Sequence, residues 1–276
     1  MEEILVEKWE QFEDHLARLD SELAGIRGKT HSSVSEPLFR GQADADWKLE
    51  TTLERTTQYT VLMEEYYRSI RAVRPAVASL TGKDWPIPDN FEPNQGRPSP
   101  PPGYEFMIYL RHHGFPSPLL DWSKSPYVAA YFAFRSKRRQ QDGNVAIYSY
   151  VEHLGEGKSW SGTRPHIHVL GPYVISHKRH YSQQCSYTIC KKLLLSHDQQ
   201  YAYASHEDVA KGAGKSQDRF MKYIFPQSER QKALDRLALM NITAFSLFGS
   251  EESLMETLGY AEIEKRILCI APDAQV

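Results

Sequence analysis

The sequence predicts an α+β protein in which mixed or antiparallel sheets pack with helices around a central cleft. Apolar residues recur at helical spacing from Ile4 to Ile26, with charged residues between them, which predicts an amphipathic helix. A second strong helix signal begins at Ser125-Pro126. After the Asp142-Gly143 turn the pattern changes to short apolar runs, which are typical of strands.

The first half of the chain gives four further elements or segments. The run Pro37 to Phe39 is interpreted as a strand, and Thr57 to Arg74 and Tyr104 to Arg111 as helices. The apolar stripe of the opening helix is interpreted as core, with a partner helix as the alternative. Residues 85–103 are rich in proline, which disfavours both helix and central strand. We expect an irregular surface loop there, either a lid over a cleft or an insertion without a role.

Ser125 caps the next helix, and basic residues from Arg135 to Arg139 suit its negative end. Strands are then expected over 145–151, 166–170, 185–190 and 220–225. Ser228 with Gln231 predicts a capping box that starts a helix through Leu239. We expect a strand over 242–248, a helix from Ser250 and a final strand over 267–270. The expected organisation is an N-terminal helix, residues 1–30, and one globular unit, residues 31–276, with an insertion at 85–103.

Composition limits the function classes. The 276 residues are 41% hydrophobic and 25% charged, which is ordinary for a soluble globular protein. Lysine and arginine total 33 against 35 acidic residues, so a surface built for generic phosphate-backbone binding is disfavoured. The cysteines Cys185, Cys190 and Cys269 show no pairing pattern, which favours a reducing compartment and buried free thiols. Without a signal-like or membrane-spanning segment, the chain is expected to be cytoplasmic.

Two blocks of the sequence resemble the FRG-domain family. The first is Leu38-Phe39-Arg40-Gly41-Gln42, followed by Trp47-Lys48-Leu49 and Leu53-Glu54-Arg55. The second runs from His112 to Ala133 and includes Leu119-Leu120-Asp121-Trp122-Ser123. A weaker similarity surrounds Arg179 and Gln183. The family name records a sequence pattern and implies no reaction by itself.

The order of motifs also resembles, more distantly, the arginine–serine–glutamate class of ADP-ribosyltransferases. That resemblance implies an ADP-ribosyltransferase-like fold and NAD as a substrate. It implies that Arg40 holds a phosphate of NAD, that Ser123 supports the nicotinamide pocket, and that Glu252 or Glu251 polarises the ribose.

The residues themselves support and limit these roles. Arg40 precedes Gly41 at the expected end of a strand, where a guanidinium can bind a phosphate in bidentate fashion and glycine lets a ligand approach. Gln42 follows as a further expected contact. The alternative is a structural arginine that pairs with a nearby aspartate, such as Asp44 or Asp121.

Other expected NAD contacts come from the second block. Asp121 and Trp122 would form a polar wall and an aromatic platform, or else a tight turn and a core tryptophan. Ser123 is the better ligand contact of the two serines, because Ser125 already acts as a helix cap. His113 and Tyr131 complete the expected site. A helix-capping histidine and ordinary core packing are their alternatives.

Glu251 and Glu252 lie in the expected first turn of a helix, where the helix dipole favours acidic residues whatever their function. In the catalytic interpretation one carboxylate stabilises an oxocarbenium-like transition state as nicotinamide leaves. The 11 histidines form no ligand set with metal-like spacing, so no metal site is expected.

The leading hypothesis is an NAD-dependent enzyme that transfers ADP-ribose to a nucleobase, a protein side chain or water. The alternative is a non-catalytic module that binds a nucleotide, another anion or a partner. The two are distinguished by whether Arg40, Ser123 and one of Glu251 and Glu252 meet in one cleft.

Overall fold

The computed structural model describes residues 1–31, 33–87, 100–136, 143–156, 158, 162–171, 174, 178–195, 200–212 and 217–266. The strands are β1 (Glu2–Leu5), β2 (Leu38–Gln42), β3 (Leu119–Ser123), β4 (Asn144–His153), β5 (His166–Val169), β6 (Cys185–Leu194), β7 (Gln200–Tyr203) and β8 (Gln217–Pro226). The helices are α1 (Glu10–Arg27), α2 (Thr52–Thr57), α3 (Met63–Thr81), α4 (Tyr104–His112), α5 (Pro126–Phe134), α6 (Lys178–Ser182), α7 (His206–Gly212), α8 (Arg230–Leu239), α9 (Ala244–Phe248) and α10 (Glu251–Gly259). A 3₁₀ turn (Gln227–Glu229) precedes α8, and a π-helical segment (Tyr260–Glu264) follows α10.

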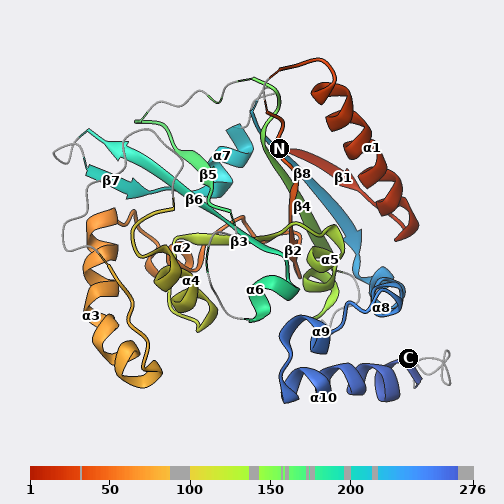
Figure 1. The fold of residues 1–276 in the computed structure, drawn as a ribbon. Coiled ribbons are helices and arrows are strands. Elements are labelled where there is room, and N and C mark those ends of the chain that lie inside the picture. Colours follow the sequence, from red (N-terminus) through yellow and green to blue (C-terminus); the bar gives the residue numbers. More distant parts are fainter. Residues whose placement is uncertain are drawn as a thin grey trace.

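One mixed sheet organises the molecule (Figure 1), in the order β1-β8-β4-β2-β3-β6-β5, with β7 also paired to β6. Only β1 runs parallel to its neighbour among the strands described, and the other pairs are antiparallel. The predicted α+β class with a mixed, largely antiparallel sheet is therefore confirmed. The β2–β3 ladder contains a single register pair, Phe39 with Ser123, and beyond it the two strands diverge.

The N-terminal segment belongs to the same core as the rest of the sheet. The prediction of one helix from Ile4 was wrong at its start, because residues 2–5 pair with β8 as a strand and α1 begins only at Glu10. Trp9, Phe12 and Leu23 are buried against α5, β4 and β8. The apolar stripe of α1 is thus core, as the simpler interpretation had it.

Several predicted elements are confirmed, with shifted ends. Helix α5 begins as expected, since the Ser125 hydroxyl accepts a hydrogen bond from the Val128 amide and Pro126 occupies the first turn. The predicted strands of the second half correspond to β4, β5, β6 and β8. The predicted helix over 57–74 corresponds to α3, which begins at Met63 and runs to Thr81, and the short helix α2 before it was not predicted.

Two predictions near the C-terminus were wrong. Residues 242–248 form helix α9 rather than a strand, because the Thr243 side chain caps it and Gly249 ends it in the left-handed conformation at φ 63°. Ser228 lies in the 3₁₀ turn and makes no cap for α8. The predicted strand over 267–270, most of the proline-rich segment (88–99) and residues 137–139 of the basic cluster lie outside the described residues.

Candidate functional site

A cleft of about 460 Å³ opens where β2 and β3 diverge. Its walls come from both strands, from α2, α4 and α5, and from α6 and α9. The lining residues are Phe39, Arg40, Gly41, Gln42, Ala43, Trp47, Arg55, Arg111, His112, Asp121, Trp122, Ser123, Ala129, Phe132, Ser136, Arg179, Gln183, Cys185 and Phe248. We call it the arginine cleft, because it holds four arginines and, among its described lining residues, one carboxylate.

Arg40 is the most constrained of the four arginines. Its Nη1 donates to the backbone carbonyl of Asp121 at 2.8 Å and so bridges the two diverging strands. Its Nε is buried without a hydrogen-bond partner among the described residues. Burial lowers the pKa of Arg40 to about 10; the Asp121 charge opposes this shift, and Arg111 and Arg55 add to it. Arg40 therefore stays cationic at neutral pH in a site that disfavours its charge.

Arg111 and Asp121 form the cleft's ion pair, with Arg111 Nη2 donating to Asp121 Oδ2 at 2.6 Å. Arg111 Nε and Asp121 Oδ1 are buried and lack a partner within the described chain. Gln42 is similar: its Nε2 donates to the Lys48 carbonyl at 3.2 Å, and its Oε1 is buried without a donor. Most buried polar atoms in native proteins are hydrogen-bonded, so these atoms and Arg40 Nε show that the buried parts of the cleft residues are incompletely paired.

Gly41 lines the cleft for a reason other than the predicted one. A Cβ atom on Gly41 would lie 1.9 Å from the carbonyl oxygen of Ala129 and 2.6 Å from the amide nitrogen of Ala133. Both atoms belong to α5, so the glycine lets this helix pack directly against β2. The ligand-approach interpretation of Gly41 is therefore corrected to a packing role.

Trp122 and Ser123 also follow their structural alternatives. The Trp122 ring is buried and packs against Tyr150 and Phe220, and its Nε1 donates to Thr188 Oγ1 at 2.8 Å. The Ser123 hydroxyl donates to the Gln183 carbonyl. Both residues border the cleft, but their polar groups already have protein partners.

The histidine that lines the cleft is His112 and not the predicted His113. His113 is exposed, and its ring lies 4.3 Å from that of Tyr109, outside the cleft lining. His112 lines the cleft instead, and its Nε2 is 2.8 Å from the Tyr187 hydroxyl. Adjacent residues on a helix point in different directions, so only one of the two histidines faces the site.

Neither predicted catalytic glutamate lines the cleft. Glu251 and Glu252 are exposed in the first turn of α10. The Ser250 hydroxyl lowers the pKa of Glu252, and the charge of Arg179 lowers it further. Arg179 itself lines the cleft, with its guanidinium 5.5 Å from the centre of the Phe248 ring. Glu251 and Glu252 therefore do not meet Arg40 and Ser123 in the cleft lining, which is the arrangement that the transferase hypothesis required.

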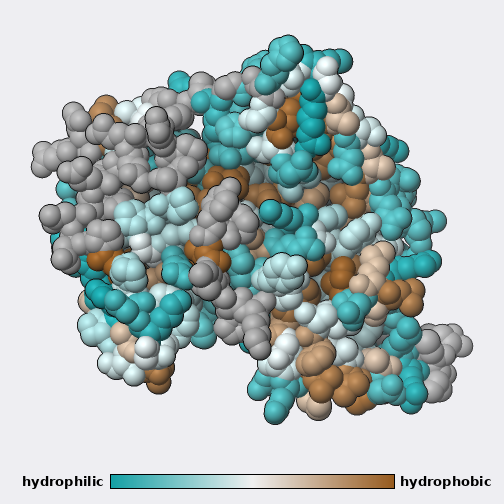
Figure 2. All heavy atoms as spheres, viewed as in Figure 1, coloured by the Kyte–Doolittle hydropathy of each residue, from teal (hydrophilic) through white to brown (hydrophobic). Residues whose placement is uncertain are grey.

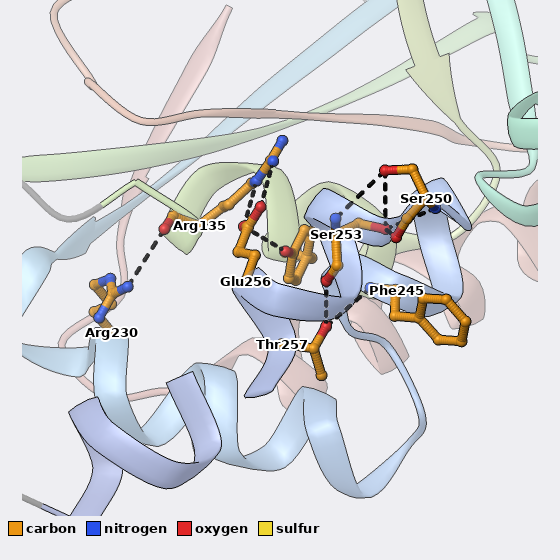
Figure 3. Close-up of polar contacts among 8 residues, drawn as sticks. Arg135, Arg230, Phe245, Ser250, Ser253, Glu256 and Thr257 are labelled. Atoms are coloured by element: carbon orange, nitrogen blue, oxygen red, sulfur yellow. Dashed lines mark hydrogen bonds and ion pairs between the residues drawn. The ribbon is translucent and has the colours of Figure 1, made fainter. Parts of the chain in front are cut away.

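Tyr131 belongs to a second cavity, of about 390 Å³, between α5, α8, α9 and the C-terminal helices. Its hydroxyl donates to Glu256, which also accepts two hydrogen bonds from Arg135 (Figure 3). All the charged residues that line this helical cavity are paired: Arg135 with Glu256, Arg230 with Glu264, and Lys265 with Asp235. The prediction that Tyr131 shares a site with Arg40 was therefore wrong.

Three cleft arginines were not predicted as site residues. Arg55 and Arg179 lie inside motifs that were noted for other reasons, and Arg111 directly precedes His112. Arg111 is in the last turn of α4, where the helix dipole favours a basic residue whatever its function. The local sequence therefore does not distinguish a helix-stabilising arginine from a cleft residue. Only the divergence of β2 and β3 brings these residues together.

Within the described residues no cluster of three or more histidine, cysteine, aspartate or glutamate side chains has the geometry of a metal site. The same part of the chain contains no helix long and apolar enough to cross a membrane. Cys185 and Cys190 are buried free thiols, as predicted, and Cys269 lies outside the description.

The model of the FRG domain matches residues 35–142 of the chain. This span is shorter than the expected unit of 31–276, but it includes the cleft lining from Phe39 to Ser136. Four lining residues lie beyond it: Arg179, Gln183, Cys185 and Phe248. Neither the curated proteins nor the solved structures give a significant match. The first sequence resemblance is thereby confirmed over residues 35–142, which match the model of the FRG domain.

Proposed function

We propose that the arginine cleft is a binding site for a phosphate-bearing anion. The observation that carries this proposal is the convergence of Arg40, Arg55, Arg111 and Arg179 on one cavity with a single carboxylate. Guanidinium groups bind phosphate oxygens with paired, charge-assisted hydrogen bonds. The chain as a whole has a net charge of −2, so the positive cleft is a local feature and not part of a basic surface.

Burial strengthens this electrostatic attraction. The cleft reduces contact with water around Arg40 and Arg111, and charges interact more strongly where water is excluded. Burial disfavours the charge of Arg40, so an incoming anion that neutralises this charge is favoured. Without a ligand, the positive charges of the cleft repel one another, and a bound anion reduces this repulsion.

Calorimetric titration with inorganic pyrophosphate tests the proposal. We expect saturable binding to the unmodified protein, weakened about 10-fold or more in Arg40→Met and Arg111→Met, because each substitution removes a charged donor worth about 1.5–3 kcal/mol. Lys265→Met is the matched control, since it removes one positive charge from the helical cavity. Equal weakening in all three variants, or no binding to the unmodified protein, contradicts the proposal.

A second candidate function is transfer of ADP-ribose from NAD, which the order of the arginine, serine and glutamate motifs supports, although Glu252 lies outside the cleft lining. In this reaction the bond between nicotinamide and ribose C1′ breaks and nicotinamide leaves. C1′ then bonds to a nucleobase, a protein side chain or water, which releases a proton. Arg40 would hold a phosphate of NAD, and Glu252 would approach the ribose from the first turn of α10, four residues beyond Phe248.

Nicotinamide release from NAD tests this second candidate. The transferase account expects release that Arg40→Ala abolishes and Glu252→Gln lowers at least 100-fold in rate, as for the loss of a group that stabilises transition-state charge. Release that survives Glu252→Gln removes this residue from the mechanism. Binding of NAD without any release leaves the anion-binding proposal alone.

A further inference from the structure

Trp47 is the most exposed aromatic residue among the described lining residues of the arginine cleft. It is 53% exposed, whereas Phe39 and Trp122, which also line the cleft, are each 3% exposed. The remaining rings of the lining, those of His112, Phe132 and Phe248, belong to partly buried residues. A ligand that enters the cleft from solvent therefore meets the indole of Trp47 before any other ring.

Phe248, at the α9 wall of the cleft, is engaged by other protein groups. The guanidinium groups of Arg135 and Arg179 lie 4.5 Å and 5.5 Å from the centre of its ring. The Phe132 ring packs against it edge to face at 5.9 Å. These contacts hold Phe248 as part of the wall, which leaves Trp47 as the aromatic surface for a ligand.

The loop that carries Trp47 is anchored on both sides of it. The amides of Ala45 and Leu49 donate at 2.9 Å to the carbonyl of Asn144 and to a carboxylate oxygen of Glu207. The side chains of Ala45 and Leu49 are buried, at 6% and 0% exposed. The backbone thus holds an exposed indole at the edge of the cleft, and a preformed surface of this kind lowers the entropic cost of binding.

The arginines and the tryptophan suit two different parts of one ligand. Arg55, an exposed residue of the same lining, offers a guanidinium that an anion can approach from solvent. The indole offers a π-face on which a nucleobase stacks whatever its identity. The cleft volume of about 460 Å³ is in the ordinary range for sites that bind small organic molecules. Inorganic phosphate uses only the charge, whereas a phosphate that carries a planar base uses both features.

From this combination we propose that the anion bound in the arginine cleft is a nucleotide, with its phosphate at the arginines and its base stacked on Trp47. The inference rests on the proposed anion-binding function and specifies the ligand class. It assigns to Trp47 the role of aromatic platform that the sequence analysis gave to Trp122, which the structure places in the core.

Calorimetric titration with AMP and with ribose 5-phosphate, of which only AMP carries a base, tests the inference. We expect AMP to bind the unmodified protein about 5-fold or more tightly, the lower end of the effect of one stacked base. In Trp47→Ala the affinity for AMP should fall toward that for ribose 5-phosphate, while the affinity for pyrophosphate stays unchanged within error. Trp47→Phe keeps an aromatic ring and should retain part of the preference for AMP.

Tyr59→Ala is the matched control. Tyr59 is 69% exposed and lies outside the cleft lining, so its loss should change neither affinity. Thermal melting shows whether each variant is folded. If Trp47→Ala is not folded, Trp47→Phe and the comparison on the unmodified protein decide.

The outcomes separate the two levels of the account. Equal affinities of the unmodified protein for AMP and ribose 5-phosphate overturn the inference, while pyrophosphate binding leaves the anion site standing. A preference for AMP that survives intact in a folded Trp47→Ala variant also contradicts it, because the base then binds elsewhere. Failure of pyrophosphate, AMP and ribose 5-phosphate to bind overturns the proposed function and the inference with it.

Discussion

The two cavities of this protein are similar in size and opposite in how their polar groups are satisfied. In the helical cavity, of about 390 Å³, six charged lining residues form three ion pairs. In the arginine cleft, of about 460 Å³, the four arginines share one carboxylate, and four lining residues keep a buried polar atom without a described partner. Size alone would not distinguish these cavities, whereas unsatisfied polar atoms do.

The difference follows from what surrounds each cavity. The helical cavity is enclosed by amphipathic helices whose charged side chains meet over an apolar floor that includes Leu234, Ile242 and Ala244. Apolar surface also gathers over the C-terminal helices in Figure 2, where Phe245, Met255 and Leu258 are exposed. The arginine cleft is cut into the sheet, where two strands diverge and leave polar groups facing one another. The charged residues of the helical cavity neutralise one another, whereas the arginine cleft keeps an excess of positive charge.

The largest effect on stability is expected at Gly41, where β2 packs against α5. Tyr131 of α5 and the following Arg135 line the helical cavity. Gly41→Ala should destabilise the protein by about 3 kcal/mol or more, because the new Cβ meets the backbone of α5 and the helix must shift. Urea denaturation measures the change.

Gly25→Ala is the matched control for this prediction. A Cβ on Gly25, within α1, meets nothing within 4 Å. Alanine is the better helix former, so we expect a gain of about 0.5–1 kcal/mol. Similar stabilities for the two variants would refute the packing role assigned to Gly41.

Removing an arginine should have different consequences in the two cavities. Arg230 contacts Glu264 and the carbonyls of Phe134 and Arg135, so Arg230→Met should cost about 2–3 kcal/mol by leaving a partly buried carboxylate unpaired. Arg40→Met should cost less than about 1 kcal/mol, because burial already disfavours that charge and its Nε has no partner. Chemical denaturation of both variants without ligand gives the comparison. A larger loss for Arg40→Met would make Arg40 a structural residue.

A smaller, pH-dependent effect is expected at Glu256. Arg135 holds its pKa below the ordinary value of 4.5. The ion pair therefore contributes stability above pH 4.5, and this contribution is lost as the pH falls through the lowered pKa of the folded state. Glu256→Gln should cost about 1 kcal/mol at pH 7, since the pair is partly exposed to solvent, and the difference from the unmodified protein should shrink in acid.

Glu262→Gln serves as the control for Glu256. It breaks an exposed pair with Arg266 one helical turn away, for which we expect less than about 0.5 kcal/mol. Denaturation curves at pH 7 and pH 3.5 compare the two. A difference for Glu256→Gln that persists unchanged at pH 3.5 would show that its effect is not the ion pair.

The smallest effect is expected at Glu252. Glu252→Gln should leave the melting temperature and the affinity for pyrophosphate unchanged within error, because the side chain is exposed outside the cleft lining. Differential scanning fluorimetry and the same titration measure both. A clear change in anion affinity would bring Glu252 into the site and favour the transferase candidate.

Much of the fold was predictable because its signals are local. Ser125-Pro126 marks the start of α5, and the capping residue Ser250 marks that of α10. The segment 242–248 was mispredicted because an apolar run of this length is compatible with either strand or buried helix. Strand β1 was missed because its pairing with β8 joins residues more than 200 positions apart.

The site was predictable where it falls within the two motif blocks, since Arg40, Gln42 and Asp121 line the cleft as expected. Arg40 was found from its motif, but Arg55, Arg111 and Arg179 lie on three other elements and meet it only in the folded chain. Gly41 illustrates the opposite error, since a glycine beside a candidate ligand residue does not reveal whether a ligand or a helix needs the space.

The central claim is that the arginine cleft, and not the helical cavity, binds the ligand. The most direct measurement is a crystal structure of the protein with ADP. The account predicts a phosphate group within hydrogen-bond distance of the guanidinium groups that line the arginine cleft. A nucleotide bound between α5, α8 and α10, or an arginine cleft that stays empty at saturating ADP, would contradict it.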